Sequence, residues 1–203
     1  MKGNKQHWEN TYLCKQPEQL SWTQKIPQTS LDIITGYHLP KSAAIIDIGG
    51  GDSRLADFLI DQGYSNITVL DISAHALDKA RSRLGDKSKK VKWIVSDITD
   101  FKPSDQYDIW HDRATFHFLT TTDQVAAYKK IAKQSVTGYM IIGTFSASGP
   151  EQCSGLPVKR YSALALEEEF KNEFQKIQCL AEDHHTPFNT TQHFLFCHFK
   201  RTH

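Results

Sequence analysis

The chain has 203 residues, of which 39% are hydrophobic, which is enough for one globular domain with a sizeable core. Lys and Arg number 24 and Asp and Glu 23, so the cationic surplus that drives non-specific nucleic-acid binding is absent. The apolar stretches are too short to cross a bilayer, and the N-terminal residues lack a signal-peptide core. We therefore expect a cytoplasmic protein with neither a nucleic-acid nor a membrane partner.

The four cysteines are widely separated and form no CxxC pair, which predicts reduced thiols rather than a disulfide framework or a zinc site. They are Cys14, Cys153, Cys179 and Cys197. Four histidines near the C-terminus, His184, His185, His193 and His198, lack ligand spacing. We therefore predict no metal site.

Residues 1–40 are helix-like and rich in aromatic side chains, among them Trp8, Tyr12 and Trp22. We expect this segment to cover the core at 41–203 as a packing layer or a lid, within a single domain. The aromatic side chains either stack on a ligand or bury the N-terminal helices.

From residue 43 onward, short apolar runs alternate with segments of helical spacing. Strands are predicted at 43–48, 66–70, 91–95, 107–110 and 139–142. Helices are predicted from Leu55 to near Gly63, from Ser73 to Leu84, and from Asp123 to before Gly138. Strands separated by helices of this length form right-handed crossovers and a parallel sheet that is covered on both faces. This pattern predicts a doubly wound α/β fold.

The C-terminal part departs from the alternation. After a helix at 162–171, two strand-like runs at 174–182 and 192–200 are joined by a turn-rich connection, which is typical of a hairpin. We therefore expect the sheet to end with an antiparallel strand.

Acidic and glycine residues come after three successive strands. The first strand ends in Asp47 and the run Gly49, Gly50 and Gly51, the second ends at Asp71, and the third is followed by Asp97. Ligands of a doubly wound sheet bind at the carboxyl ends of its strands. Glycines let the backbone approach a ligand, and carboxylates at these places can accept hydrogen bonds from an ammonium group, a ribose and an adenine amine. Together these groups describe S-adenosylmethionine, although a single acid after a strand is more often a turn or helix cap.

The alternative of a nicotinamide- or flavin-dependent oxidoreductase is disfavoured. Its dinucleotide fingerprint, G-x-G-x-x-G, needs a third glycine that packs the helix under the pyrophosphate. That position holds Arg54.

At these residues the sequence resembles the class I S-adenosylmethionine-dependent methyltransferases, from about residue 43 to 145. The resemblance implies a seven-stranded sheet whose last strand is antiparallel. It also implies that Asp47 and Gly49 to Gly51 hold the methionine end of the cofactor, that Asp71 with Ile72 holds the ribose, and that Asp97 with Ile98 holds the adenine. Trp22 and the backbone near His111 would complete this site. Ser53 stands where many members have a further glycine.

Further motifs are similar to a bacterial subgroup of that family: Trp8 to Tyr12, Leu20 to Gln24, Trp110 to Leu119 and Gly149 to Pro157. They indicate no particular methyl acceptor.

His111, Asp112 and Arg113 come after the fourth strand, where the methyl group would meet its acceptor, and they are the candidate catalytic residues. The alternative is a structural pair in which Asp112 holds Arg113. His117 is interpreted as a core histidine, and Cys153 as either a substrate contact or a small buried residue.

These patterns predict an enzyme that transfers a methyl group to a small molecule by in-line displacement, with His111 or Asp112 as the base if the acceptor needs one. Two alternatives stay open. One is a protein lysine methyltransferase, which would need an acid-lined channel, and the other is a non-catalytic, cofactor-binding partner subunit.

Overall fold

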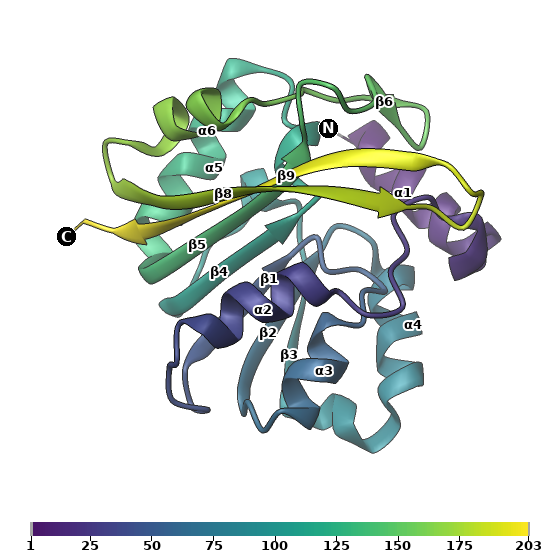
Figure 1. Cartoon of the computed structure of the whole chain (residues 1–203). Helices are drawn as coiled ribbons and strands as arrows, with labels where there is room; N and C mark the ends of the chain where they lie inside the picture. Colours follow the sequence, from purple (N-terminus) through teal and green to yellow (C-terminus); the bar gives the residue numbers. More distant parts are fainter. Residues whose placement is uncertain (1, 203) are drawn as a thin grey trace.

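The computed structural model describes residues 2–202, and its central feature is a seven-stranded sheet in the order β3-β2-β1-β4-β5-β9-β8 (Figure 1). Its strands are β1 (Ala44–Ile48), β2 (Asn66–Asp71), β3 (Val91–Val95), β4 (Tyr107–Arg113), β5 (Val136–Phe145), β8 (Phe174–His185) and β9 (Thr191–Arg201). The pairs from β3 to β5 are parallel, whereas β9 runs antiparallel to both β5 and β8. This arrangement confirms the predicted doubly wound sheet with an antiparallel last strand.

Helices cover both faces of the sheet. They are α1 (Lys2–Cys14), α2 (Gln28–Gly36), α3 (Leu55–Asp61), α4 (Ala74–Leu84), α5 (Thr122–Ser135) and α6 (Ala163–Phe170), with short 3-10 turns at Pro17–Gln19, Gly85–Lys90, Ile98–Asp100 and Phe116–Phe118. Apolar side chains of α2, α3 and α4 belong to one buried cluster, and those of α5 and α6 belong to another on the opposite face. A small hairpin of β6 (Gln152–Cys153) and β7 (Leu156–Pro157) lies in the loop after β5.

Local sequence signals explain where the helices begin. The hydroxyl of Ser73 accepts a hydrogen bond from the backbone N–H of Ala76 and so caps α4. Thr121 and Gln124 form a reciprocal capping box at the start of α5. Each cap fixes the first turn of a helix that begins near the carboxyl ends of the parallel strands.

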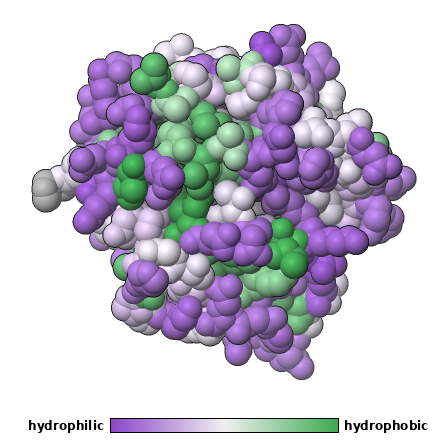
Figure 2. All heavy atoms as spheres, viewed as in Figure 1, coloured by the Kyte–Doolittle hydropathy of each residue, from purple (hydrophilic) through white to green (hydrophobic). Residues whose placement is uncertain are grey.

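The N-terminal segment packs against this core. Helix α1 contacts α4, and α2 contacts α3. Figure 2 shows apolar side chains gathered near the centre of one face, where α2 borders the β8–β9 hairpin of Figure 1. Over residues 2–202, none of the helices has the length and apolar character needed to span a membrane.

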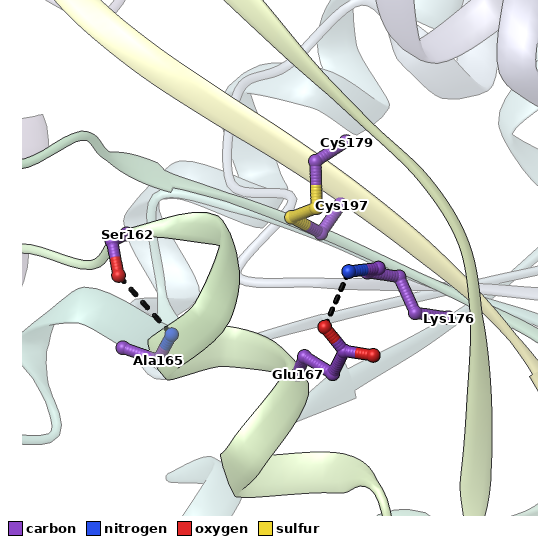
Figure 3. Close-up of a disulfide and its surroundings, with 6 residues drawn as sticks. All are labelled: Ser162, Ala165, Glu167, Lys176, Cys179 and Cys197. Carbon is purple, nitrogen blue, oxygen red and sulfur yellow. Dashed lines mark hydrogen bonds and ion pairs between the residues drawn. A yellow bond between two sulfur atoms is a disulfide. The ribbon is translucent and has the colours of Figure 1, made fainter.

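The prediction that all four cysteines are reduced thiols is wrong for two of them. Cys179 and Cys197 are directly opposed on the antiparallel strands β8 and β9, and the structure joins them by a disulfide (Figure 3). The two cysteines are 18 residues apart in the sequence, and only the register of the hairpin shows that they lie opposite each other. Cys14 and Cys153 are free thiols.

We expect the disulfide to stabilise the fold by about 2–4 kcal/mol, because it closes a loop in the unfolded chain. Replacement of the partly exposed Cys179 by Ser should lower the free energy of unfolding by this amount, as measured in urea. Cys14→Ser, which alters an exposed free thiol, is the matched control and should leave the midpoint unchanged. Four reactive thiols in the unfolded, unreduced protein would contradict the disulfide.

Candidate active site

A cavity of about 1610 Å³ lies at the carboxyl ends of β1 to β4. Its wall includes most of the residues expected at the cofactor site: Trp22, Asp47, Gly49, Gly50, Asp71, Ile72, Asp97, Ile98 and His111. Gly51 lies between Gly50 and Asp52, which both line the cavity. The structure therefore brings the predicted residues together around one space.

The turn after β1 is packed so tightly that a Cβ atom does not fit at its glycines. A Cβ atom on Gly49 would lie 1.7 Å from Oγ1 of Thr115, and one on Gly50 would lie 2.6 Å from Oδ2 of Asp47. Gly49 and Gly51 also have φ values of +65° and +48°, which glycine adopts without strain. The hydroxyl of Thr115 fills the space above Gly49 and donates to the carbonyl of Ile48 at 3.2 Å.

Asp71, at the end of β2, is a buried carboxyl that faces this turn. It accepts hydrogen bonds from the backbone N–H of Ser73, at 2.8 Å, and of Gly51. Burial raises the pKa of Asp71 to about 7, and the nearby carboxylates of Asp47 and Glu9 add to that rise. A hydroxyl donor from a ligand would stabilise the ionised carboxylate.

Asp97 comes after β3 and caps a short 3-10 turn. Its Oδ1 accepts hydrogen bonds from the backbone N–H and the hydroxyl of Thr99, at 2.9 and 2.7 Å. The capping interpretation of this acid is therefore correct for one of its oxygens. The residue still lines the cavity, beside Ser96 and Ile98.

Asp47, His111 and Ser30 form a buried chain of hydrogen bonds. Nδ1 of His111 lies 2.7 Å from Oδ1 of Asp47, and Nε2 lies 2.8 Å from the hydroxyl of Ser30 in α2. All three residues are less than 5% exposed. Both ring nitrogens of His111 are therefore occupied, and the chain fastens the N-terminal segment to strands β1 and β4.

A second link to the N-terminal segment comes from Glu9, which sequence reasoning missed. Its carboxylate accepts hydrogen bonds from the backbone N–H groups of Ala74 and His75 and from the hydroxyl of Ser73, at the start of α4. These bonds and the His75 ring hold the pKa of Glu9 at about 2, although partial burial opposes the shift. Only the folded contact between α1 and α4 reveals this role.

Trp8, Tyr12 and Trp22 cover the cavity as an aromatic cluster. The ring centroids of Trp8 and Trp22 are 5.6 Å apart, and those of Tyr12 and Trp22 are 6.3 Å apart. All three side chains line the cavity, and the hydroxyl of Tyr12 lies 2.8 Å from a Cβ placed on Gly51. The two interpretations of these aromatics, packing and ligand cover, are therefore compatible.

The assignment of Asp112 as a catalytic residue is wrong, because its side chain points away from the cavity. Alternation along β4 turns His111 and Arg113 toward α2 but turns Asp112 toward α5. There the carboxylate is fully buried and accepts hydrogen bonds from the hydroxyl of Tyr128 and the backbone N–H groups of Thr115 and Phe116. Nor does Asp112 hold Arg113. Its role is to support the loop after β4.

Arg113, His117 and Cys153 have distinct surroundings. Nη1 of Arg113 donates to the carbonyl of Trp22 at 3.0 Å, and the guanidinium lies over the ring of Phe194. His117 is fully buried, as expected of a core histidine, and burial lowers its pKa to about 3. Cys153 is buried at the cavity wall, where desolvation raises its thiol pKa to about 11.

The residues around the cavity fit S-adenosylmethionine. Backbone without side chains at Gly49 and Gly50 lines the cavity, the Asp71 carboxyl accepts a hydrogen bond from the next glycine, Gly51, and Asp97 and Ile98 lie one strand further along. Among residues 2–202, no group of three or more His, Cys, Asp or Glu side chains is arranged to hold a metal ion.

Comparison with known proteins agrees with this geometry. Residues 45–138 match the family model described as "Methyltransferase domain". A malonyl-[acyl-carrier protein] O-methyltransferase of Anoxybacillus flavithermus is 34% identical over 110 residues, which cover 53% of this chain and 40% of that protein. The mouse eEF1A lysine and N-terminal methyltransferase is 22% identical over 130 residues, or 64% and 18% of the two chains. These matches thus take in well under two thirds of either curated relative.

Solved structures give the same fold. The N-methyltransferase NodS from Bradyrhizobium japonicum WM9, in complex with S-adenosyl-L-homocysteine, superposes with a TM-score of 0.71 at 12% identity, over 98% of this chain and all of that one. The family match covers residues 45–138, and the sheet topology is the one expected of the class I S-adenosylmethionine-dependent methyltransferases. This confirms the resemblance seen in the sequence.

We expect Gly49→Ala to lower the affinity for S-adenosylhomocysteine at least tenfold, because the new methyl group displaces Thr115 from the turn. Calorimetric titration measures the loss. Gly85→Ala is the matched control, since Gly85 also has a positive φ of 56° but has open space around its Cβ position. An unchanged affinity in Gly49→Ala would show that the turn does not contact the cofactor.

Replacement of Asp112 by Asn should cost about 1–3 kcal/mol of stability, because the amide cannot accept from the Tyr128 hydroxyl with the same geometry. Urea unfolding measures this loss, with the surface variant Asp123→Asn as the control. The affinity of Asp112→Asn for S-adenosylhomocysteine should stay within twofold of the wild type. A wild-type stability combined with lost methyl transfer would restore Asp112 as a catalytic residue.

Proposed function

We propose that the protein transfers a methyl group from S-adenosylmethionine to a small-molecule acceptor. The observation that carries this proposal is the convergence of the glycine turn, the buried Asp71 carboxyl and Asp97 on one wall of a single cavity. In this assignment, Gly49 to Gly51 and Asp47 hold the methionine end, Asp71 the ribose hydroxyls, and Asp97 with Ile98 the adenine.

The cofactor supplies a methyl group on a sulfonium centre, and the neutral thioether that remains is a good leaving group. The chain then needs chiefly to align the acceptor and to exclude water. The aromatic cluster of Trp8, Tyr12 and Trp22 covers the cavity and would exclude water. His111 is a positioning residue in this account, since Asp47 and Ser30 occupy both of its ring nitrogens.

The alternatives from the sequence receive less support. A lysine side chain would favour an acid-lined channel, whereas the cavity wall at the end of β4 carries Arg113. The similarity to a protein methyltransferase covers only 18% of that relative. A non-catalytic partner subunit would not need to keep Asp47, Asp71 and Asp97, and all three are present. The cytoplasmic location expected from the sequence stays a prediction.

Methyl-labelled S-adenosylmethionine tests the proposal. The purified protein is incubated with a cell extract that has been separated into small-molecule and protein fractions. Label that appears in the small-molecule fraction, and that is lost with Asp71→Ala, supports the proposal. Label in a protein band would favour the lysine alternative. Label in neither fraction, despite cofactor binding, would favour the non-catalytic subunit.

The affinity for S-adenosylhomocysteine should rise with pH from about 5 to 7 and then level off, because the pKa of Asp71 is about 7 in the free protein. The ribose hydroxyls need the ionised carboxylate, so binding releases a proton below that pH. Glu9 stays ionised throughout, with a pKa of about 2.

Calorimetry in buffers of different ionisation enthalpy measures this proton release. Asp71→Asn should remove the pH dependence along with part of the affinity. Asp112→Asn is the control, because burial raises the pKa of Asp112 to about 6 but its side chain lies outside the cavity. A slope that persists in Asp71→Asn would assign the titration to another group.

A further inference from the structure

We propose that Arg113 binds an anionic group, of the carboxylate class, on the methyl acceptor. This inference rests on the proposed function and names a property of its unidentified substrate. It starts from a guanidinium that the folded chain buries beside the cavity but leaves largely unpartnered.

The hydrogen bonds of Arg113 are incomplete. Of its three side-chain nitrogens only Nη1 has a partner, the carbonyl of Trp22, while Nε and Nη2 are buried without one. No carboxylate among the described residues lies within salt-bridge distance of the guanidinium. Glu182 and Asp47 act on it only through longer-range attraction. The Glu182 carboxylate instead accepts a hydrogen bond from Gln24, at 3.1 Å.

Burial of a guanidinium without an anion lowers the stability of the folded protein, because a charge removed from water needs a partner of opposite sign. Burial lowers the pKa of Arg113 to about 10, which still leaves the group charged at neutral pH. The free Nε and Nη2 donors form the two-pronged edge that matches a carboxylate or similar planar anion. An anionic ligand that enters from the cavity and displaces the side chains covering Nε and Nη2 would supply the missing partner.

The position of Arg113 separates it from the cofactor residues. At the carboxyl ends of neighbouring strands, Asp97 comes after β3, Asp71 ends β2 and the glycine turn comes after β1. In the proposed function, the cofactor spans these three strands. Arg113 ends β4, the next strand along, and its guanidinium reaches over Phe194 of β9. The anion site therefore lies on the side of the cavity that is left for the acceptor.

The surroundings of Arg113 are consistent with an anion. Trp22 and Phe118 give the cavity an apolar wall, and Cys153 and His184 are its polar neighbours. Nε2 of His184 donates to the carbonyl of Ser21, so this nitrogen is not a partner of the guanidinium. His111 is engaged by Asp47 and Ser30 and Asp112 points away, so an acceptor whose attacking atom is itself the anion would need no base from this chain.

The test uses the protein saturated with S-adenosylhomocysteine in a chloride-free buffer. It is titrated with four carboxylates and their neutral amides: acetate, butyrate, malonate and phenylacetate against acetamide, butyramide, malonamide and phenylacetamide. At least one carboxylate should bind ten times more tightly than its amide. Arg113→Gln should abolish this preference, Arg113→Lys should keep part of it, and Arg160→Gln, at an exposed arginine, should not alter it.

Three results would overturn the inference. If no pair shows a preference for the carboxylate, the guanidinium binds no anion of this class. If Arg113→Gln lowers the affinity for S-adenosylhomocysteine itself tenfold, the anion is the carboxylate of the cofactor rather than a group on the acceptor. If the unliganded Arg113→Met protein melts well below the wild type, the guanidinium has a structural role. Failure of the wild type to bind S-adenosylhomocysteine would instead contradict the proposed function.

Discussion

The structure depends on the buried hydrogen-bond chain of Asp47, His111 and Ser30. Strands β1 and β4 are neighbours at the point where the strand order reverses, which is where a doubly wound sheet leaves room for a ligand. Asp47 and His111 are directly paired there, and the imidazole carries the connection on to α2. One histidine thus fixes the glycine turn after β1, strand β4 and helix α2 relative to one another.

The covering N-terminal segment is therefore part of the candidate site. Ser30 ties it to the sheet through His111, and Glu9 ties it to the start of α4, close to Asp71. Between these attachments, the aromatic cluster roofs the cavity. Burial under this roof raises the pKa of Asp71 and leaves Arg113 short of partners. The same enclosure makes charge recognition by these two residues strong, because water competes less with a bound ligand.

Local pattern in the sequence was enough to predict the parallel sheet and the residues that meet at one wall of the cavity. Apolar periodicity located the strands, and the acids and glycines that follow three successive strands indicated that Gly49, Asp71 and Asp97 lie close together. Contacts between distant segments were out of its reach. The disulfide between Cys179 and Cys197 needs the hairpin register, and the roles of Glu9 and Ser30 need the docking of α1 and α2. Asp112 was misassigned because β4 extends to Arg113, so that the alternation of side chains between the two faces applies to Asp112 as well.

The central claim, that this cavity is an S-adenosylmethionine site, is tested most directly by calorimetry with S-adenosylhomocysteine and, separately, NADH. We expect micromolar binding of S-adenosylhomocysteine alone, and a marked loss of affinity in Asp71→Ala but not in the surface variant Asp123→Ala. Binding of NADH instead, or of neither ligand, would contradict the methyltransferase assignment and leave only the α/β fold established.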